Sequence, residues 1–95
     1  MQPNIEQDVR NFVIETFLLG KAHLLRDDAS FIDEGLIDST GVLEIVSFIE
    51  EKYSIHVADD ELIPENLDSV INLVRYVTDK MDTAPHEAAA MAHAF

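Results

Sequence analysis

Apolar residues recur at helical spacing in three stretches of the chain, residues 4–19, 39–53 and 70–81. Between the stretches this period is lost, and the alternation of Ile55 and Val57 with polar residues is too short to pair as a sheet. A three-to-four-residue apolar repeat is typical of amphipathic helices. The pattern therefore predicts three longer helices, with buried stripes at Ile5, Val9, Phe12, Val13, Thr16 and Phe17, at Val42, Ile45, Val46, Ile49 and Tyr53, and at Val70, Leu73, Val74, Val77 and Met81.

Each predicted helix begins after a residue suited to capping. Asn4, with Gln7 three residues later, predicts a capping-box-like start, and Asp38 predicts an N-cap for the second helix. Asp68 or Ser69 serves the last helix in the same way.

The two connections differ in length. Residues 21–37 form a long first loop, which we expect to be ordered by its apolar residues Phe31, Ile32, Leu36 and Ile37. The second connection contains Asp59-Asp60-Glu61-Leu62, which suits the start of a short helix, and Pro64 predicts that this helix is short or irregular. The fold class is therefore all-α, an antiparallel-type four-helix bundle of three longer helices and one short one, with a long ordered first loop.

Residues 1–82 form one domain, and the chain changes character beyond Asp82. Thr83-Ala84-Pro85 predicts the end of the last helix, and the alanine-rich residues 83–95 predict a mobile tail. The alternative is an added short helix docked by Met91 and Phe95.

The chain is strongly acidic, with 19 acidic and 6 basic residues in 95 and a formal charge of −13. This charge disfavours nucleic acid and anionic membranes and favours basic protein partners, although acidity also serves solubility. No apolar run is long enough to span a membrane and no signal peptide is recognisable, so we expect a cytoplasmic protein. The absence of cysteine excludes disulfides and thiol catalysis by the chain's own side chains.

Ser39 is the main candidate for chemistry. Asp38 as N-cap places Ser39 in the first helical turn, where a phosphate attached to its hydroxyl would meet free backbone N–H groups and the positive end of the helix dipole. Gly41 indicates that something approaches this turn closely. The alternative is an ordinary helix-start serine, which is the commoner use of Asp-Ser.

The chain resembles the acyl carrier proteins and the related peptidyl and D-alanyl carriers from about Ile5 to Met81. The resemblance rests on Asp38-Ser39, on Gly35-Leu36-Ile37 before it, on the acidic helix after it and on Leu67-Asp68-Ser69-Val70. It implies a stand-alone carrier domain over residues 1–82 in which Ser39 bears a 4′-phosphopantetheine arm, with acyl or aminoacyl groups held as thioesters on its thiol. Asp38 would then present the serine and contribute a possible metal contact.

The resemblance also implies the partners and the surface that meets them. The partners are a phosphopantetheinyl transferase and acyl- or aminoacyl-activating and transferring enzymes with basic docking patches; the carrier itself is a monomer and not an enzyme. The cargo, whether fatty acyl, polyketide or aminoacyl, stays open. The predicted partner face consists of Thr40, Leu43, Glu44, Ser47, Glu50 and Glu51.

Other sites are excluded by spacing. No two of the four histidines are spaced as neighbouring metal ligands on one helical face, and the loop around Gly35 lacks the ligand positions of a calcium-binding loop. No nucleophile, base and orienting group can be assembled around Ser39. The alternative function is an unmodified acidic helical module that binds a basic protein partner.

Overall fold

All regular structure in the described part of the chain is helical. The computed structural model describes the backbone of residues 4–94 and the side chains of residues 4–82. Its helices are α1 (Ile5–Phe17), α2 (Ser39–Tyr53), α3 (Pro64–Leu67) and α4 (Val70–Ala94), with two 3-10 turns, η1 (Ala22–Leu24) and η2 (Asp59–Glu61). This confirms the predicted bundle of three longer helices and one short helix.

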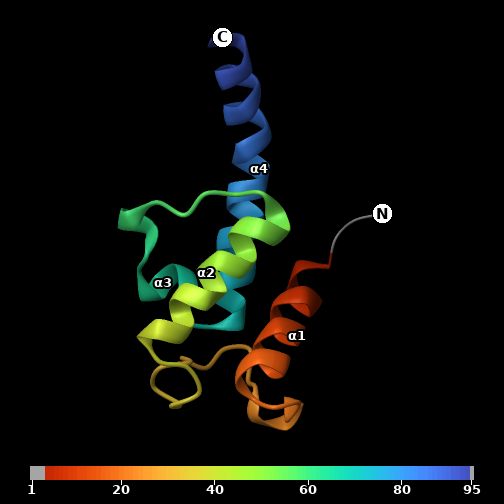
Figure 1. Cartoon of the computed structure of the whole chain (residues 1–95), viewed down its shortest axis with the longest axis vertical. Helices are drawn as coiled ribbons and strands as arrows, with labels where there is room; N and C mark the ends of the chain where they lie inside the picture. Colours follow the sequence, from red (N-terminus) through yellow and green to blue (C-terminus); the bar gives the residue numbers. More distant parts are fainter. Residues whose placement is uncertain (1–3, 95) are drawn as a thin grey trace.

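Helix α4 is the element against which the others pack. It contacts α1, α3 and α2, and Figure 1 shows α1 running opposite to α2 and α4. The long first loop closes one end of the bundle, from the end of α1 to the start of α2 (Figure 1). Ser39, the first residue of α2, therefore lies at this end of the molecule.

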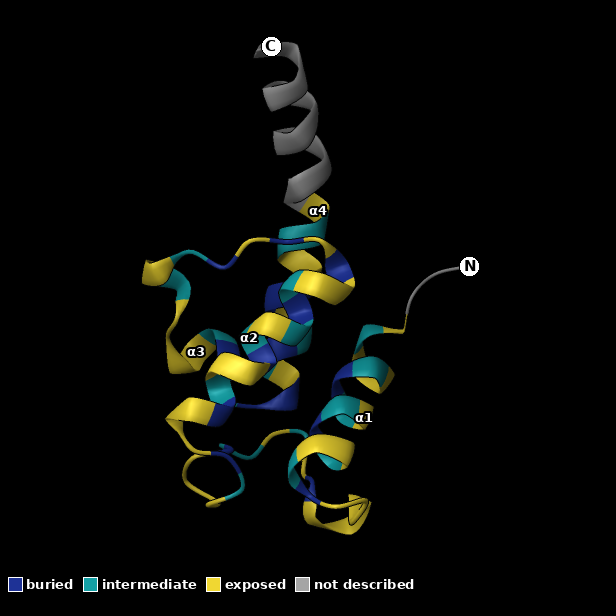
Figure 2. Cartoon of the chain, in the orientation of Figure 1, coloured by how far each residue is buried: buried dark blue, intermediate teal, exposed yellow. Residues whose placement is uncertain are grey.

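The core is formed by the inward stripes of the three longer helices together with buried residues of the connections, and buried residues are coloured dark blue in Figure 2. The prediction that Thr16 belongs to the buried stripe is wrong, because Thr16 is exposed and the chain buries Leu18 there instead. Tyr76 was not predicted and is also buried. The most deeply buried side chains are Val9, Val13, Phe31, Ile45, Ile49, Val70, Leu73 and Val77.

The helix starts follow the predicted caps, with one correction. The Asn4 side chain accepts a hydrogen bond from the Gln7 backbone N–H at 3.0 Å. The Gln7 side chain donates to Asn11 instead of returning to Asn4, so the reciprocal half of the capping box is wrong. Of the two caps proposed for α4, Ser69 is the one used, since its hydroxyl accepts from the Asn72 N–H at 3.1 Å.

The first loop is ordered by fewer apolar residues than predicted. Phe31 and Ile37 are 0% and 4% exposed, whereas Ile32 is 50% exposed, so the prediction that Ile32 pins the loop to the helices is wrong. The Phe31 carbonyl accepts from the N–H groups of Leu36 and Ile37, which closes a tight turn. Ile32 lies within that turn, on its solvent-exposed side.

Glu61 joins the second connection to α4. Its carboxylate accepts from the Ala58 N–H at 2.9 Å, the Tyr76 hydroxyl at 3.1 Å and the Lys80 Nζ at 3.1 Å. The Ala58 N–H, more than the other partners, lowers the pKa of Glu61. Burial, and then Glu61 itself, raises the pKa of Tyr76. The helix start predicted at Asp59 is only the 3-10 turn η2, and α3 itself begins at Pro64. The prediction that the third helix is short is confirmed, since it ends at Leu67.

Helix α4 extends further than the sequence predicted. It runs to Ala94, so the prediction that Thr83-Ala84-Pro85 ends the helix is wrong. The alanines that follow Pro85 are strong helix formers and favour continuation beyond it. The mobility predicted for residues 83–95 lies outside the described side chains.

Candidate functional site

Ser39 is exposed on the first turn of α2. Asp38 precedes the helix in an extended conformation, and its side chain accepts from the Gly41 N–H at 2.9 Å. The Asp38 carbonyl accepts from the Val42 N–H at 3.0 Å, so both oxygen-bearing groups of Asp38 begin the helix. No described residue is hydrogen-bonded to the Ser39 hydroxyl, which leaves it available to an external group.

Gly41 allows the first turn of α2 to lie against α1 and the loop. A Cβ atom at this position would lie 2.5 Å from Ile37 Cγ2 and 2.9 Å from Phe17 Cε1. The close approach predicted for Gly41 is therefore made by the protein's own side chains. Because Ile37 comes two residues before Ser39, this contact helps to fix where the serine lies.

An apolar groove opens beside Ser39. It measures about 230 Å³ and lies between the start of α2, the loop and α3. Four of the seven large apolar side chains that are exposed in the described chain line this groove: Ile32, Leu43, Leu62 and Ile63. Gathered exposed apolar groups are typical of binding sites. The groove is completed by Ser39, Val42, Pro64, Leu67 and Asp68.

Sequence reasoning found only part of this groove. Leu43 was predicted on the exposed side of α2, and the structure confirms it as 57% exposed. Leu62 and Ile63 were not singled out, because they lie outside every helical stripe. Two adjacent apolar residues directly before a proline were the available signal.

The predicted partner face is divided by the structure. Thr40, Leu43, Glu44, Ser47 and Glu51 are all exposed on α2. Leu43 lines the groove beside Ser39. Glu44, Ser47 and Glu51 line a separate hollow, together with Phe48 of α2 and with Phe12 and Thr16 of α1.

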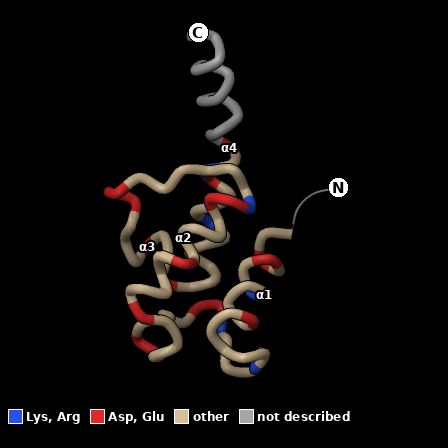
Figure 3. Tube along the Cα trace, viewed as in Figure 1, with Lys and Arg blue, Asp and Glu red and all other residues tan. Residues whose placement is uncertain are grey.

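Glu50 differs from the rest of the predicted face. It is half-buried, and its carboxylate accepts from the Val57 N–H at 2.9 Å and lies 3.5 Å from His56 Nδ1. These contacts hold the connection that follows α2. Lys52 is the one basic residue in the α2 sequence, and Figure 3 shows acidic positions along this helix.

The clearest pKa shifts in the described chain belong to groups outside the groove. Burial, followed by the hydrogen bond that the Tyr53 hydroxyl donates to Asp8 at 3.0 Å, raises the pKa of Tyr53. Together with Glu61 and Tyr76, Tyr53 has its acid–base behaviour set by structural contacts. Among residues 4–82, no three side chains of His, Asp or Glu gather as a metal site.

Among the described residues, no helix is both long enough and apolar enough to cross a membrane.

Comparison with known proteins finds relatives named acyl carrier protein. No family model matches the chain. The chain is 29% identical over 77 residues to the acyl carrier protein of Buchnera aphidicola subsp. Schizaphis graminum (strain Sg), covering 81% of this chain and 94% of the relative. It is also 29% identical over 77 residues to the acyl carrier protein of Buchnera aphidicola subsp. Acyrthosiphon pisum (strain 5A), covering 81% and 92%. These matches, together with the helical bundle described above, show that the chain is similar to acyl carrier proteins, as a distant relative at 29% identity.

Proposed function

We propose that this protein carries acyl groups as thioesters on a 4′-phosphopantetheine arm attached to Ser39. The observation that supports the proposal most is the position of Ser39, an exposed serine at the capped start of α2 and at the edge of an apolar groove. This arrangement occurs in a chain related to acyl carrier proteins over most of its length. A carrier of this family is not an enzyme, so Ser39 is a substrate for other enzymes.

The residues around Ser39 fit such an arm. The first turn of a helix presents backbone N–H groups and a positive dipole end, both of which favour a phosphate. The Asp38 carboxylate is held by the Gly41 N–H, which keeps it on the helix start. The apolar groove offers a surface for hydrocarbon, and this favours acyl groups over charged aminoacyl groups as cargo.

In the proposed modification, the chain supplies the hydroxyl and its position. Within a phosphopantetheinyl transferase, which provides the magnesium ion and a base that takes the hydroxyl proton, the Ser39 oxygen would attack the phosphorus of coenzyme A that bears the pantetheine. A phosphodiester to Ser39 forms as the P–O bond to the other phosphate of the diphosphate breaks, and adenosine 3′,5′-bisphosphate leaves. When attached, the arm supplies a thiol that holds an acyl group as a thioester. The chain has no cysteine, so no side-chain thiol can remove that acyl group by exchange.

The proposed partners recognise the exposed side of α2. Glu44 and Glu51 present negative charge to basic patches on acyl-handling enzymes, and Leu43 offers an apolar contact among them. Such docking is weak and sensitive to salt, since exposed charges are screened. Glu50 contributes through the connection that it holds in place rather than through a freely exposed carboxylate.

Intact-mass measurement after incubation with coenzyme A and a broad-specificity phosphopantetheinyl transferase tests the proposal. The native chain should gain one arm and Ser39→Ala none. Thr78→Ala is the matched control, because Thr78 is an exposed hydroxyl-bearing residue on α4, outside the proposed partner face, and should not affect loading. An unchanged mass of the native chain, in a reaction that loads another carrier fully, would favour the unmodified acidic binding module instead.

A further inference from the structure

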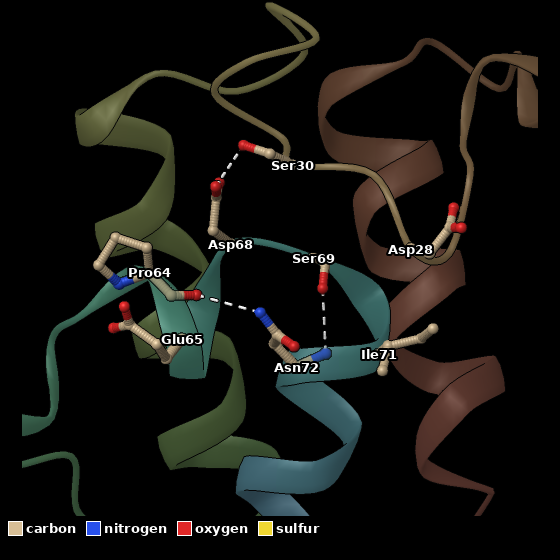
Figure 4. Close-up of a pocket in the computed structure, with 8 residues that line it drawn as sticks. All are labelled: Asp28, Ser30, Pro64, Glu65, Asp68, Ser69, Ile71 and Asn72. Carbon is tan, nitrogen blue, oxygen red and sulfur yellow. Dashed lines mark hydrogen bonds between the residues drawn. The ribbon is translucent and has the colours of Figure 1, made fainter.

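Asp68 fastens the first loop to the junction between α3 and α4. Its carboxylate accepts hydrogen bonds from the Ser30 hydroxyl and from the Ile32 N–H, the latter at 3.1 Å. Its backbone carbonyl accepts from the Phe31 N–H at 2.8 Å. Figure 4 shows the Asp68 side chain pointing toward Ser30 across the gap between the junction and the loop. Three consecutive loop residues are therefore held by a single residue distant in sequence.

This attachment continues along the loop to the serine. The Ser30 hydroxyl also accepts from the Asp33 N–H at 3.0 Å, and the Phe31 carbonyl accepts from the Leu36 N–H at 2.9 Å. The turn closed in this way ends at Ile37, whose side chain is buried against the first turn of α2. Asp38 and Ser39 follow directly.

The Asp68 carboxylate is not needed to begin α4. Ser69 caps that helix through its own hydroxyl, which accepts from the Asn72 N–H at 3.1 Å (Figure 4). Both hydrogen bonds that the Asp68 side chain accepts within the described chain come from the loop. Asp68 also lines the groove that contains Ser39, so the clasp lies beside the proposed attachment site.

We propose that Asp68 is a positioning residue for Ser39. By holding residues 30–32, it fixes the loop that leads to Ser39, so that the transferase encounters the serine in a single position. This inference rests on the proposed function of Ser39. Hydrogen bonds to a carboxylate are stronger than neutral ones, and losing both from Asp68 leaves this part of the loop held at the junction only by the Phe31 N–H. When the loop is less constrained, Ser39 occupies several positions and only some of the chains present it correctly. The apparent affinity of the modifying enzyme for the carrier therefore falls.

The test compares Asp68→Ala with Ser69→Ala in the full-length chain. Ser69→Ala removes a cap at the same junction and destabilises α4 without touching the loop, so it controls for lost stability. For Asp68→Ala we expect the KM of the transferase for the carrier to rise about fivefold to tenfold, with kcat nearly unchanged. Ser30→Ala should also raise the KM, and adding it to Asp68→Ala should raise the KM little further, because both changes break the same hydrogen bond between Ser30 and Asp68.

Amide hydrogen exchange gives a second readout that does not depend on the modification. Exchange at Leu36 and Ile37 should accelerate in Asp68→Ala and stay near the native rate in Ser69→Ala. If Asp68→Ala is loaded with native KM, or if Ser69→Ala raises the KM as much, the positioning role is overturned while the proposed function stands. If the native chain is not loaded, the proposed function falls and the role of Asp68 toward Ser39 falls with it.

Discussion

Replacing Gly41 by alanine tests how the first turn of α2 is held. In most helices this change stabilises the protein, because alanine is the better helix former by about 1 kcal/mol. Here the new Cβ would lie 2.5 Å from Ile37 Cγ2 and 2.9 Å from Phe17 Cε1, both closer than carbon atoms pack. Ile37 is 4% exposed and β-branched, so its side chain has few alternative rotamers with which to avoid the new Cβ.

The steric cost therefore exceeds the gain in helix propensity. Overpacking a well-packed site costs about 1–3 kcal/mol, against a gain of at most about 1 kcal/mol. We expect Gly41→Ala to lower the free energy of unfolding by about 1 kcal/mol. The displaced Ile37 also moves the residue pair that follows it, Asp38 and Ser39, so loading should slow as well.

Urea unfolding followed by circular dichroism measures the change, with the slope of the free energy against urea checked for constancy. Ser47→Ala is the control for helix propensity on the same helix, because Ser47 is exposed, and it should be stabilising by a few tenths of a kcal/mol. A Gly41→Ala variant as stable as the native chain, or more stable, would refute the close packing of Phe17 and Ile37 on this turn.

Three further predictions concern the helix start, the groove and the acid side of stability. Asp38→Ala should lower the free energy of unfolding by about 1 kcal/mol, because the helix cap is lost. Asp38→Asn retains an acceptor and should lower it much less. If thermal unfolding shows equal destabilisation of the two variants, the capping role of Asp38 is contradicted. Leu43→Ala should change the free energy of unfolding by less than about 0.5 kcal/mol, because the side chain is exposed, yet it should raise the KM of the transferase for the carrier several-fold. An unchanged KM would show that Leu43 is not part of the docking face. The folded-state pKa of Glu61 is lowered below its usual 4.5, so its contribution to stability is present above that value and lost as the pH falls through the folded pKa. Glu61→Gln should therefore flatten the acid limb of stability against pH, and an acid limb as steep as that of the native chain would contradict the assignment.

The helices were predictable because local periodicity and capping chemistry determine them. Asp38 was identified as a cap from its residue type and its place before an apolar stripe, and the structure confirms it. Periodicity carries no information within a loop, and this is why Ile32 was wrongly assigned to the interior. The error at Thr16 has a related cause. Helix α1 ends at Phe17, and the buried position after it is taken by Leu18, which lies outside the helical period.

The parts of the site that escaped prediction depend on contacts between residues far apart in the sequence. Asp68 meets Ser30 from another element, and nothing local to either residue indicates the contact. Glu50 was predicted as part of the exposed acidic face, because its contact with the Val57 N–H forms only in the folded chain and is not visible in the sequence. The groove likewise forms only when α3 packs beside the start of α2. Ser39 was found because its setting is local: a serine directly after a capping aspartate.

The central claim is that one hydroxyl, that of Ser39, receives the arm. Its most direct test is fragmentation mass spectrometry of the chain after loading with coenzyme A and a phosphopantetheinyl transferase, read at the level of single residues. The account predicts that the added mass lies on Ser39 alone. An arm found on another serine or threonine, or a peptide containing Ser39 that keeps its unmodified mass while a reference carrier is fully loaded, would contradict it.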